Sequence, residues 1–226
     1  MFTLYIANKN YSSWSLRAWV LMRELGIPFE EKLVPLGVSL AERAFSPSGR
    51  VPCLVDGDTT VWDSLAITEY LAEQFSKVWP ADTVARAWAR SASAEMHSGF
   101  FDLRGTCSMN CGVRVRIDNF PAGVLADVAR IDELWNDGLA RFGGPFLAGA
   151  AFTAVDAFFA PVAFRFQTYA PKLSERSLQY ADRLLSLPSM KAWYASALEE
   201  TWRFEEYETA IHLVGTLLDD HRRAAD

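Results

Sequence analysis

Strand-like segments are confined to the first third of this 226-residue chain, and helix-like segments fill most of the rest. Apolar runs and turn signals predict strands over residues 2–7, 29–34, 52–56 and 59–62, and helices from about 13 to 25 and 64 to 75. A helix between the first two strands makes them parallel, and the turn at Asp56-Gly57-Asp58 adds an antiparallel pair. This order predicts an α/β domain with a mixed sheet and the pattern βαβ-ββα.

Long helical patterns follow that domain. They cover residues 83–103, 121–142, 154–168, 174–186 and 188–200. The composition changes over residues 76–82, which include Pro80, so a domain boundary is expected there. We predict an α/β domain over 1–78, a linker over 79–84 and an all-helical domain over 85–226. Half of the chain is apolar and 13% is aromatic, which argues against intrinsic disorder.

Charge and cysteine content limit the partners of the chain. The 22 basic and 28 acidic residues give a net charge of −6, which argues against a broad basic footprint for nucleic acid or an acidic membrane. Three cysteines are too few for a disulfide framework, as is typical of a reducing compartment. No run reaches the roughly 18 apolar residues of a membrane span, and no basic leader precedes the first apolar run. We expect a cytoplasmic protein with no nucleic-acid or membrane partner.

The first predicted helix begins among hydroxyl residues, in the run Tyr11-Ser12-Ser13-Trp14-Ser15. Serine is a favoured N-cap because its oxygen accepts a hydrogen bond from an orphan amide at the helix start. A hydroxyl at a helix N-terminus can also stabilise an anion such as a thiolate, and can lower a thiol pKa by about one or two units. Each unit corresponds to about 1.36 kcal/mol. This segment alone leaves both interpretations open.

Two later segments carry the same ambiguity. Val51-Pro52 stands at the start of a predicted strand, where proline is common. A cis peptide bond there would indicate a specific structural requirement. Asp63-Ser64 starts another helix and would serve as a cap. The same pair could bind the end of an amino acid, with Ser64 and helix amides on a carboxylate and Asp63 on an ammonium group.

In this order and spacing, the motifs together resemble the cytosolic glutathione transferases. The resemblance rests on Ser12 to Arg17, on Arg50-Val51-Pro52, on Asp63-Ser64 with the Leu-Ala-Ile that follows, and on Phe152-Thr153-Ala154-Val155-Asp156. The last segment matches the family's capping box, in which a Thr and an Asp three residues later satisfy each other's amides. The likeness spans nearly the whole chain and weakens after about Leu198. The serine-rich first motif looks most like the zeta-type and related bacterial branch.

The resemblance implies a thioredoxin-like N-terminal domain, an all-α C-terminal domain and a homodimer. It implies that Ser12 donates a hydrogen bond to the glutathione thiolate, a role that the neighbours Ser13 and Tyr11 could also take. Val51, before a cis Pro52, would pair with the cysteinyl backbone of glutathione. Asp63 and Ser64 would hold the γ-glutamyl end, and Arg50 and Ser13 would complete the glutathione groove.

The chain departs from the zeta pattern at Trp14, where that pattern has a cysteine. A thiol that assists zeta chemistry is therefore missing, which argues against maleylacetoacetate isomerisation and against cysteine-type members that form mixed disulfides. No Cys-x-x-Cys motif stands at the first helix, so dithiol exchange is also disfavoured.

A second substrate would need an apolar pocket beside the thiol, between the two domains. The candidates for its walls are one aromatic residue of the first predicted helix, three polar residues near the start of the second domain and one arginine of an apolar helix: Trp14, His97, Arg104, Asn110 and Arg165. His97 is better explained as a hydrogen-bonded structural residue than as a catalyst. Arg165 lies in an apolar helix, and buried arginine needs a partner, which would be either an internal carboxylate or a substrate carboxylate.

Other residues in this part of the chain have simpler interpretations. Met96, Phe100 and Leu103 recur at helical spacing and are expected in the core. Cys107 and Cys111 are expected to be free thiols, and the tail His221-Arg222-Arg223 is expected to be a solvated end.

The sequence therefore predicts a glutathione transferase with glutathione as co-substrate, a small hydrophobic electrophile as second substrate and no metal. The three histidines, His97, His212 and His221, form no ligand pattern. Three alternatives stay open: a zeta-like cis–trans isomerase, a non-catalytic glutathione- or ligand-binding protein, and an interaction module that uses the same fold.

Overall fold

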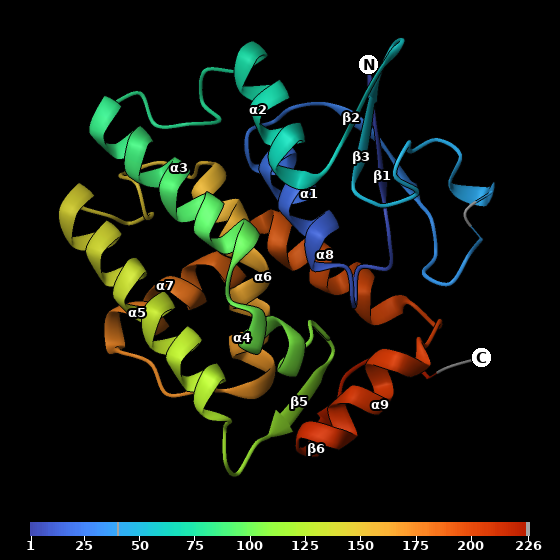
Figure 1. The fold of residues 1–226 in the computed structure, drawn as a ribbon, viewed down its shortest axis with the longest axis vertical. Helices are drawn as coiled ribbons and strands as arrows, with labels where there is room; N and C mark the ends of the chain where they lie inside the picture. The colour runs from blue at the N-terminus through green and yellow to red at the C-terminus, as the bar shows by residue number, and fades with distance from the viewer. Residues whose placement is uncertain (40, 225–226) are drawn as a thin grey trace.

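The computed structural model describes residues 1–39 and 41–224. Four strands form the N-terminal sheet in the order β2-β1-β3-β4: β1 (Phe2–Ile6), β2 (Phe29–Leu33), β3 (Cys53–Asp56) and β4 (Thr59–Trp62). β1 and β2 are parallel, and the β1–β3 and β3–β4 pairs are antiparallel. The predicted mixed sheet is therefore confirmed, with strand ends within one residue of those expected (Figure 1).

Helix α1 (Ser13–Glu24) joins the two halves of the molecule. It packs on β1 and on α2 (Ser64–Gln74) in its own domain, and on α6 (Ala154–Tyr169) and α8 (Pro188–Glu199) of the helical domain. Every residue from Ser15 to Met22 is consequently buried. The helix ends before Gly26, whose φ of +67° is the left-handed conformation that glycine adopts most easily.

Helices make up most of the second domain, as predicted. They are α3 (Thr83–Ser98), α4 (Phe101–Thr106), α5 (Ala122–Phe142), α6 (Ala154–Tyr169), α7 (Glu175–Ser186), α8 (Pro188–Glu199) and α9 (Glu205–Val214), and a short 3-10 turn, η1 (Ala41–Arg43), lies in the first domain. Helix α6 is the centre of this domain, because nearly all of its residues are buried. Among the described residues, no helix is long and apolar enough to cross a membrane.

The predicted helix over 83–103 is wrong in one respect, because it is broken in two. α3 ends at Ser98 with Gly99 as its C-cap, and Phe100 has a φ of 55°, which a right-handed helix cannot accommodate. A side chain on Gly99 would collide with the carbonyl oxygen of Glu95, at 2.8 Å from the added Cβ. The break redirects α4, and Met96, Phe100 and Leu103 are buried as expected, whereas Phe101, the first residue of α4, is exposed.

The C-terminal segment differs most from the sequence predictions. Helix α9 was not predicted, and neither were two short strands, β5 (Val113–Arg116) and β6 (Thr216–Asp220), which pair antiparallel beside the helices. The prediction of a solvated tail is wrong for Arg222, whose side chain is only 4% exposed. Its guanidinium pairs with Glu208 at 2.6 Å and with Asp220 at 2.7 Å.

The predicted capping box at the start of α6 is present. The Asp156 carboxylate accepts the backbone N–H of Thr153 at 2.9 Å, and the Thr153 side chain caps the first turn in return. The same carboxylate accepts the Leu147 N–H at 3.0 Å and the Tyr180 hydroxyl at 2.8 Å. Burial raises the pKa of Asp156 to about 6. The group thus ties α7 and the preceding loop to the central helix.

We predict that Asp156→Ala lowers the free energy of unfolding by about 3 kcal/mol or more, because three donors lose a buried acceptor. Urea unfolding followed by circular dichroism measures this change. Asp118→Ala is the control, since that side chain is 70% exposed, and a change below about 0.5 kcal/mol is expected there. A comparably small change in Asp156→Ala would contradict the role given to this carboxylate.

Candidate functional site

A buried polar turn leads from β1 into α1. The carbonyl of Asn8 accepts the N–H groups of Tyr11 at 3.2 Å and of Ser12 at 2.8 Å. The N–H groups of Lys9 and Asn10 donate to the Glu200 carboxylate at 2.6 Å and 3.2 Å. Burial raises the pKa of Glu200, while these two amides favour its charged form. A residue just after α8 therefore holds the backbone that carries Ser12.

Ser12 is the N-cap of α1 and also faces a cavity. Its hydroxyl donates to the Ser15 hydroxyl at 2.8 Å and lies 3.4 Å from the Ser15 N–H, a long capping contact. The Ser15 oxygen in turn accepts the Ala7 N–H at 3.1 Å. The two interpretations of this serine are thus compatible, because one hydroxyl can cap the helix and line the cavity.

The two neighbouring hydroxyls have other partners. The Tyr11 hydroxyl donates to Glu208 at 2.7 Å, and burial together with this carboxylate raises the pKa of Tyr11 to about 12. The Ser13 hydroxyl accepts from the Arg165 guanidinium at 3.4 Å. Of the three neighbouring hydroxyls of Tyr11, Ser12 and Ser13, that of Ser12 is therefore the one that engages neither a carboxylate nor a guanidinium in the described chain.

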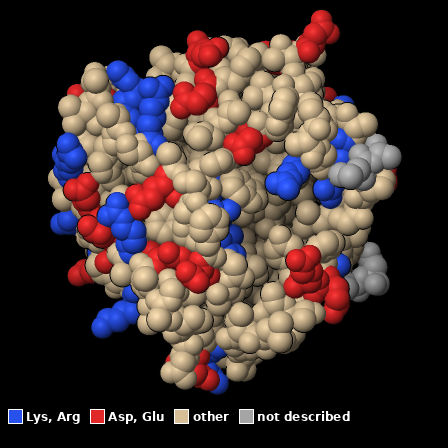
Figure 2. Space-filling view, viewed as in Figure 1, with Lys and Arg blue, Asp and Glu red and all other residues tan. Residues whose placement is uncertain are grey.

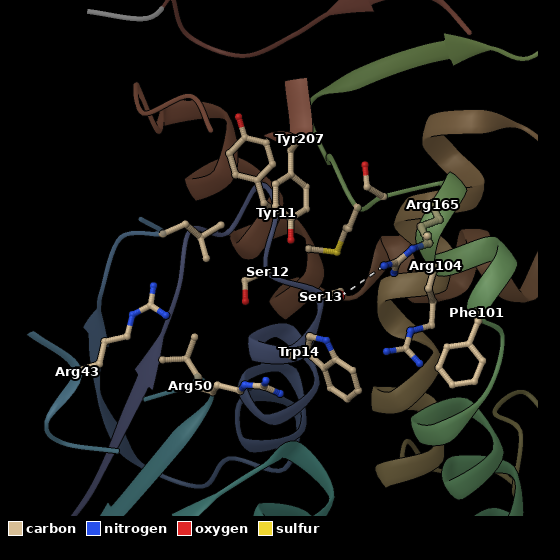
Figure 3. Close-up of a pocket in the computed structure, with 15 residues that line it drawn as sticks. Tyr11, Ser12, Ser13, Trp14, Arg43, Arg50, Phe101, Arg104, Arg165 and Tyr207 are labelled. Carbon is tan, nitrogen blue, oxygen red and sulfur yellow. Dashed lines mark hydrogen bonds between the residues drawn. The ribbon is translucent and has the colours of Figure 1, made fainter. Parts of the chain in front are cut away.

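The cavity in front of Ser12 has a volume of about 440 Å³ and lies between the two domains (Figure 3). Figure 2 shows the corresponding hollow near the centre of this face, with basic side chains on its walls. Its lining comes from α1, from the segments after β2, and from α4, α6 and α9: Tyr11, Ser12, Ser13, Trp14, Leu36, Arg43, Arg50, Val51, Phe101, Arg104, Gly105, Ser108, Met109, Arg165 and Tyr207.

A second cavity, of about 550 Å³, shares the residues Trp14, Arg50 and Val51 with the first. Its other walls are Ser48, Pro52, Trp62, Asp63 and Ser64. The Val51–Pro52 peptide bond is cis. Two of the sequence motifs, Val51-Pro52 and Asp63-Ser64, therefore meet in one recess that opens beside Ser12.

Asp63 and Ser64 have features that helix capping leaves unexplained. The Asp63 carboxylate does cap α2, accepting the Leu65 N–H at 2.8 Å. The Asp63 backbone, however, has a φ of 74°, which is energetically costly for a residue with a side chain. Such conformations recur at functional sites. The Ser64 hydroxyl is buried at the cavity wall and has no hydrogen-bond partner among the described residues.

Trp14 is enclosed by two arginines. The Arg17 and Arg104 guanidinium carbons lie 4.3 Å and 4.7 Å from its ring centroid. Arg17 is buried and forms no ion pair within the described chain, and its Nε and Nη1 atoms lack hydrogen-bond partners. Burial, and then repulsion from Arg104 and Arg165, lower the pKa of Arg17. The substitution of Trp for Cys thus supplies an aromatic face that two cations contact.

Arg165 has no internal ion pair in the described part of the chain, so that interpretation is wrong. Its guanidinium donates to the carbonyls of Cys107 at 2.8 Å and Pro161 at 3.3 Å and to the Ser13 hydroxyl. All of these acceptors are neutral. The side chain lines the cavity, although the residue is only 5% exposed.

Two of the five candidates for the electrophile site lie outside the cavity walls. The Asn110 side chain accepts from Asn10 at 2.8 Å and donates to Glu208 at 3.2 Å, so it links the domains. His97 stands behind Trp14, with its Nε2 atom 3.6 Å from Asp63 Oδ2. Sequence reasoning missed Arg43, Phe101 and Tyr207, which reach the cavity only through the tertiary fold.

Sequence comparison identifies both domains. The glutathione S-transferase N-terminal domain matches residues 11–74, and the glutathione S-transferase C-terminal domain matches residues 82–196. The chain belongs to the glutathione S-transferase family. These matches include the Ser12, Val51-Pro52 and Asp63-Ser64 motifs that form the two cavities.

Individual relatives are more distant or match only in part. A dichloromethane dehalogenase of Methylorubrum extorquens is 44% identical over 59 residues, which is 24% of this chain and only 20% of that protein's length. Glutathione S-transferase 3 of Zea mays is 25% identical over 216 residues, covering 88% of this chain and 90% of that one. A glutathione transferase homologue from Burkholderia, solved with bound glutathione, has the same fold, with a TM-score of 0.67, 24% identity, and coverage of 87% and 97%.

The cysteines do not contribute to the candidate site. Cys53, Cys107 and Cys111 are buried free thiols, and burial raises the pKa of each, to about 12 for Cys107. Within residues 1–39 and 41–224, no group of three or more His, Cys, Asp or Glu side chains could hold a metal ion. Thiol chemistry at this site therefore needs a sulfur from outside the protein.

We predict that none of the three thiols of the native protein reacts with Ellman's reagent at neutral pH on the time scale on which glutathione does, since the thiolate is the reactive form. All three should react in denaturant. Rapid modification of one thiol in the native protein would contradict this burial and would introduce a protein nucleophile.

Proposed function

We propose that this protein is a serine-type glutathione transferase, in which Ser12 activates the thiol of bound glutathione for attack on a small electrophile. The observation that carries the proposal is the Ser12 hydroxyl at the N-terminus of α1, facing a cavity that adjoins the Asp63-Ser64 recess. Family membership and the glutathione bound to the Burkholderia homologue support it. The zeta-like character of the first motif belongs to the same proposal.

Glutathione would span both cavities. Its γ-glutamyl end would occupy the inner recess, where Asp63 pairs with the ammonium group and the Ser64 hydroxyl donates to the carboxylate. The backbone of Val51, before Pro52, would pair with the cysteinyl residue, and Arg50 and Ser13 would line the groove. This placement gives the unpartnered Ser64 hydroxyl an acceptor and accounts for the strained Asp63 backbone.

The chemical step would begin when the thiol proton leaves to solvent. The Ser12 hydroxyl turns from Ser15 to donate to the thiolate, and the Ser15 hydroxyl then donates to the Ser12 oxygen, 2.8 Å away. The partial positive charge at the N-terminus of α1 favours the anion further. The thiolate attacks an electrophilic carbon held in the cavity next to Ser12, and proximity supplies much of the rate.

Two other interpretations predict different results. A zeta-like isomerase would add the thiolate reversibly to a double bond and release glutathione unchanged, but Trp14 replaces the assisting thiol. A non-catalytic glutathione-binding protein would bind the tripeptide with an ordinary thiol pKa. A cytoplasmic homodimer is part of the transferase proposal and rests on the family resemblance.

The test is a pH titration of the ultraviolet thiolate absorbance of bound glutathione, in the wild type and in Ser12→Ala. We expect a bound pKa at least about one unit below that of a free thiol, near 8.5, and its return toward that value in the variant. Activity at pH 7 should then fall about tenfold in Ser12→Ala.

Ser13→Ala is the matched control, because it removes the adjacent hydroxyl and leaves the Ser12–Ser15 pair intact. Its bound thiol should keep the lowered pKa. An unchanged thiol pKa in Ser12→Ala, with the rise appearing in Ser13→Ala instead, would contradict the role of Ser12. An ordinary pKa in the wild type would favour the non-catalytic interpretation.

A further inference from the structure

Four arginines line the cavity in front of Ser12, in two pairs that face each other. Arg43 and Arg50 come from the N-terminal domain, and Arg104 of α4 and Arg165 of α6 come from the helical domain. Figure 3 shows the two pairs on opposite sides of Ser12 and Trp14. Among the described residues that line this cavity, none is an aspartate or a glutamate.

The pair on the helical domain carries uncompensated charge. Arg104 donates to the carbonyls of His97 at 3.3 Å and Gly99 at 2.9 Å, and Arg165 bonds neutral oxygens only. Neither forms an ion pair within the described chain. Burial lowers the pKa of Arg104. Burial followed by repulsion from Arg104 lowers the pKa of Arg165 to about 10, which still leaves Arg165 charged at neutral pH.

Glutathione leaves this pair free in the proposed orientation. With the γ-glutamyl carboxylate at Ser64 and the cysteinyl backbone at Val51, the glycyl end continues along the N-terminal wall, which carries Arg43 and Arg50. The tripeptide has one further carboxylate, and that wall accommodates it. Arg104 and Arg165 therefore face the space left for the second substrate.

We propose that the second substrate carries a carboxylate, held by Arg104 and Arg165 while its electrophilic carbon faces Ser12. This inference rests on the proposed transferase function and refines the expectation of a purely hydrophobic electrophile. A guanidinium pair in a partly dry cavity recognises a carboxylate through charge-assisted hydrogen bonds and discriminates against a neutral isostere.

The test compares 4-chloro-3,5-dinitrobenzoate with its methyl ester, which share the reactive carbon. In both, the thiolate of glutathione forms the new carbon–sulfur bond, the carbon–chlorine bond breaks, and chloride leaves with its electron pair. The acid-to-ester ratio is kcat/KM for the acid divided by kcat/KM for the ester, each first divided by its uncatalysed rate. We expect this ratio to be about ten or more.

Four variants locate the preference. Arg104→Met should lower the acid-to-ester ratio about tenfold and leave the KM for glutathione within about twofold. Arg165→Met should have the same effects. If the Arg165 variant does not fold, the Arg104 variant alone tests the preference, because Arg104 is less buried. Arg43→Met, on the opposite wall, should raise the KM for glutathione and leave the ratio unchanged. Arg130→Met, at an exposed ion pair, controls for net charge and should leave both unchanged.

Binding without chemistry separates this inference from the proposed function. Isothermal titration calorimetry measures the affinity of the protein, with and without glutathione, for 3,5-dinitrobenzoate and for its methyl ester. Both compounds lack the leaving group. Tighter binding of the acid than of the ester in the wild type, with the difference lost in Arg104→Met, supports the carboxylate site. This result would stand even if glutathione failed to bind. A failure to bind glutathione would contradict the transferase proposal alone. The inference would be overturned if the wild type bound the acid and the ester with equal affinity. It would also be overturned if Arg104→Met weakened only the binding of glutathione.

Discussion

The geometry of the site depends on a carboxylate from the far end of the chain. Glu200, just after α8, accepts the N–H groups of Lys9 and Asn10 and so holds the turn from which α1 begins. The Trp193 indole N–H donates to the Lys9 carbonyl at 2.8 Å, and Asn110 bonds the Asn10 side chain. A turn outside regular secondary structure can be buried only if its backbone groups are paired. The helical domain supplies those partners and thereby positions Ser12.

The same interface concentrates positive charge. Arg17, Arg104 and Arg165 surround Trp14 and Ser13 without a carboxylate partner in the described chain, and burial opposes the charge on each. Such a cluster destabilises the unliganded fold, because like charges repel and guanidinium groups lose water. It also favours the charged forms of a thiolate and a carboxylate in the adjoining cavity. In the proposed reaction, this one set of side chains would assist Ser12 in stabilising the thiolate and would also select an acidic substrate.

Local sequence signals predicted the parts of this site that depend on neighbouring residues. The start of α1 at Ser12, the capping box at Thr153 and Asp156, and the hairpin before Asp63 each follow from a few adjacent positions. The β5–β6 pair joins segments about a hundred residues apart, and its alternating Val-Arg pattern is too short to stand out. Arg222 reaches Glu208 only because the β5–β6 strand pair folds the C-terminal segment back onto the helices. Partners brought together by tertiary contacts leave no pattern in a single sequence.

The most direct test of this account is a crystal structure of the protein with glutathione. We predict the cysteinyl sulfur within hydrogen-bond distance of the Ser12 hydroxyl, the γ-glutamyl end on Asp63 and Ser64, and the glycyl carboxylate toward Arg43 and Arg50. Arg104 and Arg165 should make no contact with the tripeptide. A sulfur bonded instead to Tyr11 or Ser13 would contradict the proposed activation. A glycyl carboxylate on Arg165 would contradict the division of the cavity between its two substrates.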